Sequence, residues 1–216
     1  EKKGFSKMIK QVYNPYLPLD EYIPDGEPHV FGDRIYIFGS HDREGGSTYC
    51  ELDYTVYSAP VSDLTDWKCE GIIYRAVQDP HYCKERKQMY APDVVQGPDG
   101  RYYLYYALSG NSGKGGFDGP ISVAVCDSPA GKYEYYGDVH YSNGKLLDRF
   151  VLFDPAVMND DGKIYLYYGW SLFMNMGNSR IGRRINEKIQ QKMFHKSLKE
   201  IRAEADGIMG ATVVEL

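Results

Sequence analysis

The sequence predicts an all-β fold of the propeller type, because one strand–turn–strand unit recurs about three times in 216 residues. Each unit joins a short strand, a Gly-Asp or Asp-Gly turn, and a second strand rich in Tyr, Ile and Leu. The three copies are anchored by Pro28, Pro92 and Pro155, which are spaced 64 and 63 residues apart. A fixed period indicates one supersecondary unit used repeatedly, and a hairpin unit favours the blades of a propeller.

The first blade is predicted over residues 25–89, after a lead-in at 1–24 in which two X-Pro pairs break any helix. A hairpin turn is expected at Gly32-Asp33. Residues 53–58 alternate between apolar and polar side chains, which is typical of a half-buried strand.

The second blade is predicted over residues 90–152. Its Asp99-Gly100 pair lies between alternating hydrophobic residues and is a strong signal for a tight hairpin. Residues 121–126 are expected to form another strand. The Gly-rich loop at 111–119 lacks the phosphate-binding pattern and precedes no helix, so nucleotide binding is not predicted.

The third blade is predicted over residues 153–216, with its turn at Asp161-Gly162. A charged insertion at about 176–206 interrupts this blade, and part of it is expected to be helical. The insertion is interpreted as a solvated segment between two strands, with a basic patch for an acidic partner as the alternative. The whole chain, 1–216, is thus predicted to be a single, incomplete propeller domain.

Composition limits the classes of partner. The hydrophobic content of 43% suffices for a core, and the net charge of −5 gives no broad basic face for nucleic acid. No run approaches the roughly 20 apolar residues of a membrane span. The four cysteines form no CxxC pair, so we expect free thiols and no zinc site. Free thiols favour a cytoplasmic location, and a secreted protein that has lost its signal peptide is the alternative.

An aspartate lies near the start of the inner strand in each predicted blade: Asp25, Asp93 and Asp154. Inner strands begin near the central channel of a propeller, so these carboxylates are expected to converge there. Hydrolysis of a glycosidic bond needs one carboxylate to activate water and another carboxyl group to protonate the leaving oxygen. The alternative is that each aspartate caps a turn, because Asp next to Pro or Gly is typical of turns.

Three motifs, in order, resemble glycoside hydrolase family 43: Pro-Asp-Gly-Glu-Pro-His-Val-Phe, Tyr-Ala-Pro-Asp-Val, and Asp-Pro-Ala-Val followed by Asp-Asp-Gly-Lys. The resemblance covers about residues 14–170. It implies a five-bladed propeller that inverts configuration while hydrolysing β-xylosides or α-L-arabinofuranosides of plant polysaccharides such as xylan. It implies no cofactor, and leaves open a channel ion such as calcium. Gly26 departs from the family, which usually has Pro there, and Tyr90 stands where Trp is common.

The resemblance also implies roles for single residues. Asp25 is expected to be the general base, and Asp93 to orient the general acid and raise its pKa. Asp154 corresponds to a third-blade aspartate of the inner-strand framework and is counted among the substrate-binding residues. His41 and Tyr90 are the other expected sugar contacts. For His41, a buried imidazole with both nitrogens satisfied is the alternative.

The family places its general acid, a Glu, at the start of a fourth blade. Glu187, Glu200, Glu204 and Glu215 lie in other sequence contexts, so none is assigned this role. The chain is therefore expected to be the N-terminal part of a longer enzyme and inactive alone. The remaining blades would come from a missing C-terminal part or another chain. The alternatives are a non-catalytic carbohydrate-binding propeller and a protein-interaction propeller unrelated to sugars.

Overall fold

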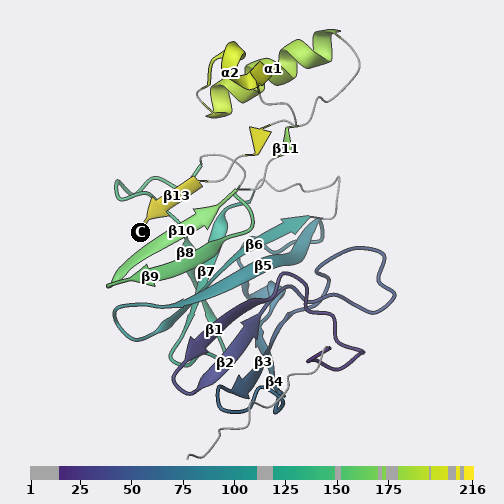
Figure 1. The fold of residues 1–216 in the computed structure, drawn as a ribbon, viewed down its shortest axis with the longest axis vertical. Coiled ribbons are helices and arrows are strands. Elements are labelled where there is room, and N and C mark those ends of the chain that lie inside the picture. The colour runs from purple at the N-terminus through teal and green to yellow at the C-terminus, as the bar shows by residue number, and fades with distance from the viewer. Residues whose placement is uncertain are drawn as a thin grey trace, which may run out of the picture.

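The structure, a computed structural model, consists mainly of three antiparallel sheets that follow one another as blades of a β-propeller (Figure 1). The predicted all-β propeller with about three blades is thus confirmed. The structure describes residues 15–110, 119–148, 152–169, 172–173, 180–194, 196–203, 208–209 and 212–216. The expected lead-in at 1–14, loop residues 111–118 and insertion residues 176–179, 195 and 204–206 lie outside this description.

Blade 1 is a four-stranded sheet with its strands in sequence order. It comprises β1 (Glu27–Phe31), β2 (Arg34–Phe38), β3 (Tyr54–Pro60) and β4 (Lys68–Tyr74). The alternating segment predicted at 53–58 falls within or next to β3. The pairing of β3 with β4 contains two register shifts, which bend the outer edge of the blade.

Blade 2 repeats this topology. After a single 3₁₀ turn at Ala76–Gln78, it comprises β5 (Arg86–Gln96), β6 (Tyr102–Gly110), β7 (Ile121–Cys126) and β8 (Glu134–Asp138). Its inner strand begins four residues before the expected blade boundary at residue 90. The long β5–β6 pair carries a register shift between Tyr90 and Asp93, where the inner strand reaches the centre of the propeller.

Blade 3 contains three described strands in the order β13-β10-β9. They are β9 (Ala156–Asp160), β10 (Lys163–Tyr168) and β13 (Thr212–Glu215). The outermost strand of this sheet is thus the last strand of the chain, and the charged insertion separates it from its neighbour β10.

The insertion consists of a short strand pair that carries two helices. These elements are β11 (Leu172–Phe173), α1 (Arg180–Phe194), α2 (Leu198–Ala203) and β12 (Ile208–Met209). Figure 1 shows both helices beyond the ends of the sheets, at the top of the view. At the start of α2, Ser197 and Glu200 exchange hydrogen bonds between side chain and backbone, as in a capping box.

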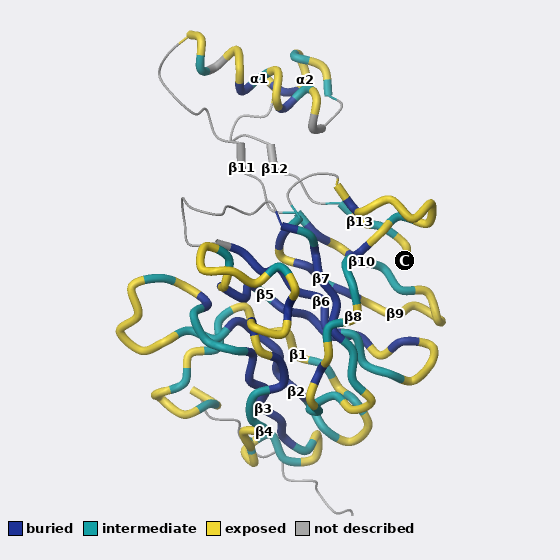
Figure 2. The backbone as a smooth tube through the Cα atoms, turned by 180° about the vertical axis from the view of Figure 1, so that it is seen from behind, coloured by how far each residue is buried: buried dark blue, intermediate teal, exposed yellow. Residues whose placement is uncertain are grey.

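The core lies between successive blades, and Figure 2 shows the buried segments along the sheets. Tyr54 and Tyr74 of blade 1 and Tyr106 of blade 2 belong to the first inter-blade cluster and are fully buried. Their hydroxyl groups are paired: Tyr74 with Tyr106 at 2.9 Å, and Tyr54 with the carbonyl oxygen of Tyr90 at 2.9 Å. Buried tyrosines are tolerated because each ring packs while its hydroxyl finds a partner.

All four cysteines are free thiols, as the sequence predicts. Cys50 is buried, Cys126 is half-buried, and Cys69 and Cys83 are exposed. Among the helices of the described residues, none is long and apolar enough to cross a bilayer.

Candidate active site

Two of the three predicted aspartates precede inner strands in a strained backbone conformation. Asp25 lies two residues before β1 with φ of 56°, and Asp154 lies two residues before β9 with φ of 47°. A positive φ is uncommon for residues other than Gly, and such outliers cluster at functional sites. Both side chains therefore lie outside the regular alternation of the strands that follow them.

Asp25 and Asp154 form an electrostatically coupled pair. The pKa of Asp154 is raised to about 6, first by partial burial of its carboxyl group and second by the negative charge of Asp25. Both residues still have exposed surface, so solvent or a ligand can reach them. The structure thus brings together two carboxylates from different blades.

Asp93 has a different environment, because it lies within β5 and is only 2% exposed. Its Oδ2 atom accepts the backbone N–H of Val157 at 2.6 Å. Its Oδ1 atom accepts the N–H of Val94 at 2.7 Å and lies 2.5 Å from Nε2 of His29. These partners come from β1, β5 and β9, so Asp93 joins the inner strands of all three blades. Its expected role in tuning a general acid stays a prediction, and its contacts favour a framework role.

Glu27 is a further acidic residue of this region that the sequence reasoning missed. Burial, followed by the charge of Asp93, raises the pKa of Glu27, and the neighbouring His29 opposes this rise. A signal was present in the sequence, because Glu27 directly precedes Pro28 just as Asp154 precedes Pro155.

An aromatic pair lies beside these carboxylates. The rings of Tyr90 and Phe153 have centroids 5.1 Å apart and pack in one small cluster with Cys50. Burial raises the pKa of Tyr90 to about 12, with a smaller contribution from Cys50. The charges of Asp25 and Asp154 help to raise the pKa of Cys50, so this cluster lies beside the aspartate pair. A contact between Tyr90 and a sugar stays a prediction.

His41 follows β2 and contacts two other segments of blade 1 and its lead-in. Its Nδ1 atom is 2.9 Å from the carbonyl oxygen of Asp53, which fixes that nitrogen as the donor. Its Nε2 atom lies 3.6 Å from the carboxylate of Glu21. Only Nδ1 is hydrogen-bonded, which favours a structural role for His41, and a sugar contact stays a prediction.

The glutamates considered as general acids make other contacts where they are described. Glu187 pairs with Arg202, Glu200 with Ser197, and Glu215 with Lys163. Glu204 lies outside the described residues. None of the three described contacts involves the aspartate pair, so these side chains are not assigned to the site.

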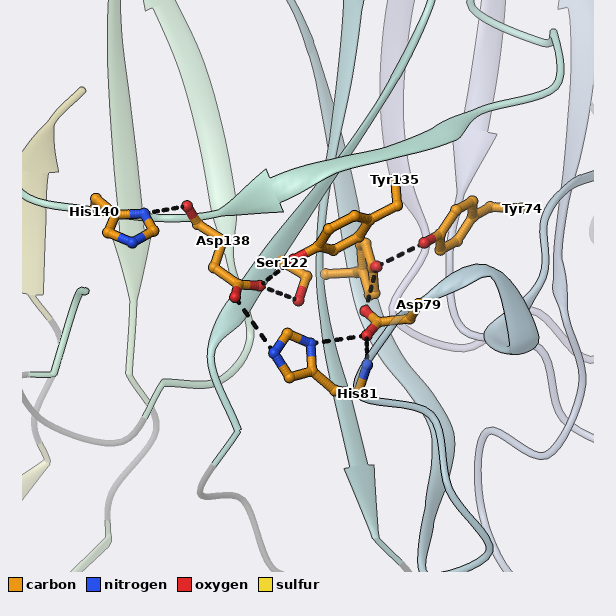
Figure 3. A network of polar contacts seen from close by, with 8 residues as sticks. Tyr74, Asp79, His81, Ser122, Tyr135, Asp138 and His140 are labelled. Atoms are coloured by element: carbon orange, nitrogen blue, oxygen red, sulfur yellow. Dashed lines mark hydrogen bonds and ion pairs between the residues drawn. The ribbon is translucent and has the colours of Figure 1, made fainter. Parts of the chain in front are cut away.

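A second polar network supports the entry into β5 and joins blades 1 and 2 (Figure 3). Asp79 is buried, and its carboxylate accepts hydrogen bonds from the hydroxyl of Tyr106 at 2.5 Å and from the backbone N–H of His81 at 2.6 Å. The imidazole of His81 lies between two carboxylates, 2.9 Å from Asp79 and 3.4 Å from Asp138 of β8. This network fixes the segment that leads to Tyr90 and Asp93.

No group of three or more His, Cys, Asp or Glu side chains in the described part of the chain is arranged to hold a metal ion. A channel ion such as calcium therefore stays a sequence-based prediction without a ligand set.

Comparison with known proteins decides the family. The model of "Glycosyl hydrolases family 43" matches residues 17–205, which is most of the chain. The chain belongs to glycoside hydrolase family 43. A xylosidase/arabinosidase from Thermoclostridium stercorarium is 52% identical to it over 167 residues. Xylosidase/arabinosidase 43A from Humicola insolens is 33% identical over 160 residues.

Solved structures of family 43 enzymes share the fold. The GH43_1 enzyme from Xanthomonas citri, solved in complex with xylose, superposes with a TM-score of 0.53 at 28% identity, over 75% of this chain. The family 43 chain spans 34% of the Thermoclostridium protein, 43% of the Humicola protein and 44% of the Xanthomonas chain. The fold is the five-bladed type of propeller, of which the described strands make up about three blades.

Proposed function

We propose that this family 43 chain carries the water-activating side of an inverting glycosidase that acts on β-xylosides or α-L-arabinofuranosides. The observation that carries the proposal is the pair Asp25 and Asp154, which lead the inner strands of two blades and are coupled through their charges. Two accessible carboxylates beside an aromatic cluster suit a sugar and a water molecule.

Asp25 is the general base in this proposal. Its carboxylate takes a proton from water while the water oxygen bonds to the anomeric carbon, and the bond from that carbon to the leaving oxygen breaks. The leaving oxygen takes a proton from a separate carboxylic acid. The described contacts of Glu187, Glu200 and Glu215 do not supply that acid, so only the water-activating step is assigned to this chain.

Asp154 is proposed to act as the charged neighbour of Asp25. Its pKa is raised to about 6, first by burial and second by the charge of Asp25, so its protonation state responds to its neighbour. Asp93 is proposed as the framework residue that holds β1, β5 and β9 in place around them. The family resemblance implies the tuning role for Asp93 and the framework role for Asp154, and this proposal exchanges the two.

The substrate class rests on the family relatives. Both relatives described above carry the name xylosidase/arabinosidase, and the Xanthomonas enzyme was solved with xylose. A xylopyranose lacks the exocyclic hydroxymethyl group of its hexopyranose counterpart. A site that leaves no room for this group would therefore select xylose over glucose on size.

The test uses the longest polypeptide that the gene encodes, with nitrophenyl β-xyloside and nitrophenyl α-L-arabinofuranoside as substrates. Asp25→Asn is expected to abolish turnover while leaving the circular dichroism spectrum intact, because Asn removes the base but tolerates a positive φ. Proton NMR of the first product should detect the inverted anomer. Near-normal turnover by Asp25→Asn would remove Asp25 from the role of base.

A non-catalytic sugar-binding propeller is the second candidate, and it is favoured by the contacts that occupy the described glutamates. Titration of the chain with xylose, arabinose and glucose distinguishes the two. Binding of a pentose without any turnover of the nitrophenyl glycosides supports the binding module, whereas turnover that depends on Asp25 supports the enzyme.

A further inference from the structure

Ser40 connects the proposed base to the second blade. It follows β2 after Gly39 and is fully buried. Its hydroxyl lies 3.0 Å from Oδ2 of Asp25 and 2.8 Å from the backbone nitrogen of Ala91. One small side chain of blade 1 thus contacts both the lead-in to β1 and the inner strand of blade 2.

The hydrogen-bond chemistry fixes the direction of the Ser40 proton. The N–H of Ala91 can only donate, so the Ser40 oxygen accepts from it. A hydroxyl has a single proton to donate. The thiol of Cys50 also hydrogen-bonds to Ser40, and burial raises its pKa to about 12, so it remains a neutral S–H group. The carboxylate of Asp25 accepts only, and the Ser40 proton is therefore directed at its Oδ2 atom.

The backbone around Ser40 requires this close approach. A Cβ atom on Gly39 would lie 2.7 Å from both the Ile23 side chain and the carbonyl oxygen of Pro24. Glycine is therefore needed for the lead-in to pass directly over the end of β2. On the other side, Ala91 has φ of 29°, a strained conformation just before Pro92 that aims its N–H at Ser40.

We propose that Ser40 is a positioning residue for the general base, an inference that rests on the proposed function of Asp25. Its hydroxyl holds Oδ2 of Asp25, which leaves Oδ1 as the oxygen that meets the attacking water. The same bond favours the charged form of Asp25 next to the like charge of Asp154. Ser40 thereby makes the environments of the two carboxyl groups unequal, so that they can take different roles.

The first test measures the carboxyl group itself and needs no activity. The chain is labelled with ¹³C-aspartate, and the Cγ resonance of Asp25, assigned with Asp25→Asn, is followed against pH. Ser40→Ala removes the hydrogen bond to Oδ2 and is expected to move the Asp25 titration midpoint upward. Ser40→Thr, which keeps the hydroxyl, should restore it.

The matched control is Ser58→Ala. Ser58 of β3 is equally buried in the same blade, but its hydroxyl contacts Arg34 and Glu70. This variant should leave the Asp25 midpoint where it is in the wild type. Ser40→Cys is nearly isosteric and serves as the second variant if Ser40→Ala does not fold, and a partial upward movement is expected for it. An unchanged midpoint in Ser40→Ala, or in Ser40→Cys, would overturn the proposal.

The second test uses the nitrophenyl glycosides and the longest polypeptide that the gene encodes. Ser40→Ala is expected to lower kcat about tenfold with little change in KM, and to move the acidic limb of the pH profile upward. A purely structural role would lower the amount of folded enzyme without moving that limb. If the wild type shows no turnover at all, the proposed function fails, and the titration still decides the role of Ser40.

Discussion

The Oδ2 atom of Asp93 accepts the backbone N–H of Val157 at 2.6 Å, so a carboxylate buried in β5 fixes the backbone at the start of β9. The same carboxylate also accepts from the N–H of Val94 and contacts His29 of β1. A buried carboxylate is tolerated only when its oxygens are hydrogen-bonded. Asp93 meets this condition by joining three blades at their common centre.

Asp93→Ala should therefore destabilise the fold. It leaves two backbone donors and one imidazole without an acceptor, and an unsatisfied buried donor costs about 1–3 kcal/mol. We expect the free energy of unfolding in urea to fall by about 3 kcal/mol. Asp93→Asn keeps one carbonyl oxygen and should lose less. A change below about 0.5 kcal/mol in Asp93→Ala would contradict the framework role.

Tyr106→Phe tests the network that supports the entry into β5. The Tyr106 hydroxyl donates to the buried carboxylate of Asp79 and contacts the hydroxyl of Tyr74. A hydrogen bond to a charged group contributes about 1.5–3 kcal/mol, so we expect a loss of about 2 kcal/mol in thermal unfolding. Tyr165→Phe, whose hydroxyl lies at the surface near Glu215, is the control and should change stability little. Equal losses in both variants would argue against the network.

The hairpins were predictable from sequence because their turns have strict local chemistry. The Asp99-Gly100 pair forms the turn between β5 and β6, and Gly100 has φ of 85°, which glycine adopts freely. The strand predicted at 121–126 coincides with β7. The outer strands β4 and β8 were harder to predict, because their exposed residues alternate less clearly and bulges interrupt their pairing.

Which two of the three aspartates interact could not be predicted from the sequence. Asp25 lies three residues before its anchor proline, Asp93 one residue after and Asp154 one residue before. All three offsets are odd, so strict strand alternation would place the three side chains on one side of the sheet. The positive φ values of Asp25, Ala91 and Asp154 break that alternation. As a result, Asp93 is buried in the framework, while Asp25 is coupled to Asp154. Only tertiary packing sets these φ values.

Gly39→Ala tests the close approach that brings Asp25 to Ser40. The added methyl group would lie 2.7 Å from a backbone oxygen, which cannot move without displacing the lead-in. Overpacking of this kind costs about 1–3 kcal/mol, and we expect a loss near 2 kcal/mol in urea unfolding together with a displaced Asp25 resonance. Gly100→Ala is the control: a Cβ atom there meets nothing within 4 Å, so any loss of stability comes from the positive φ alone, and the Asp25 resonance should stay unchanged. An unaltered Asp25 signal in Gly39→Ala would contradict the packing argument.

The raised pKa of Asp154 predicts a pH dependence of stability with a definite sign. Its carboxyl group has an ordinary pKa of 3.8 when unfolded and about 6 when folded, so the folded state holds the proton more tightly. The stability contributed by this group is fully present below about pH 4 and is lost as the pH rises through about 6. Asp154→Asn stays neutral and should lack this loss. The difference between its urea concentration at half-unfolding and that of the wild type should therefore increase from pH 4 to pH 7.

Asp25→Asn removes the second cause of the raised Asp154 pKa. It should lower the pH at which the Asp154 carboxyl group titrates in ¹³C NMR, although burial keeps that pH above the ordinary pKa. A titration midpoint of Asp154 near pH 4 in the wild type would contradict the coupling between these two carboxylates.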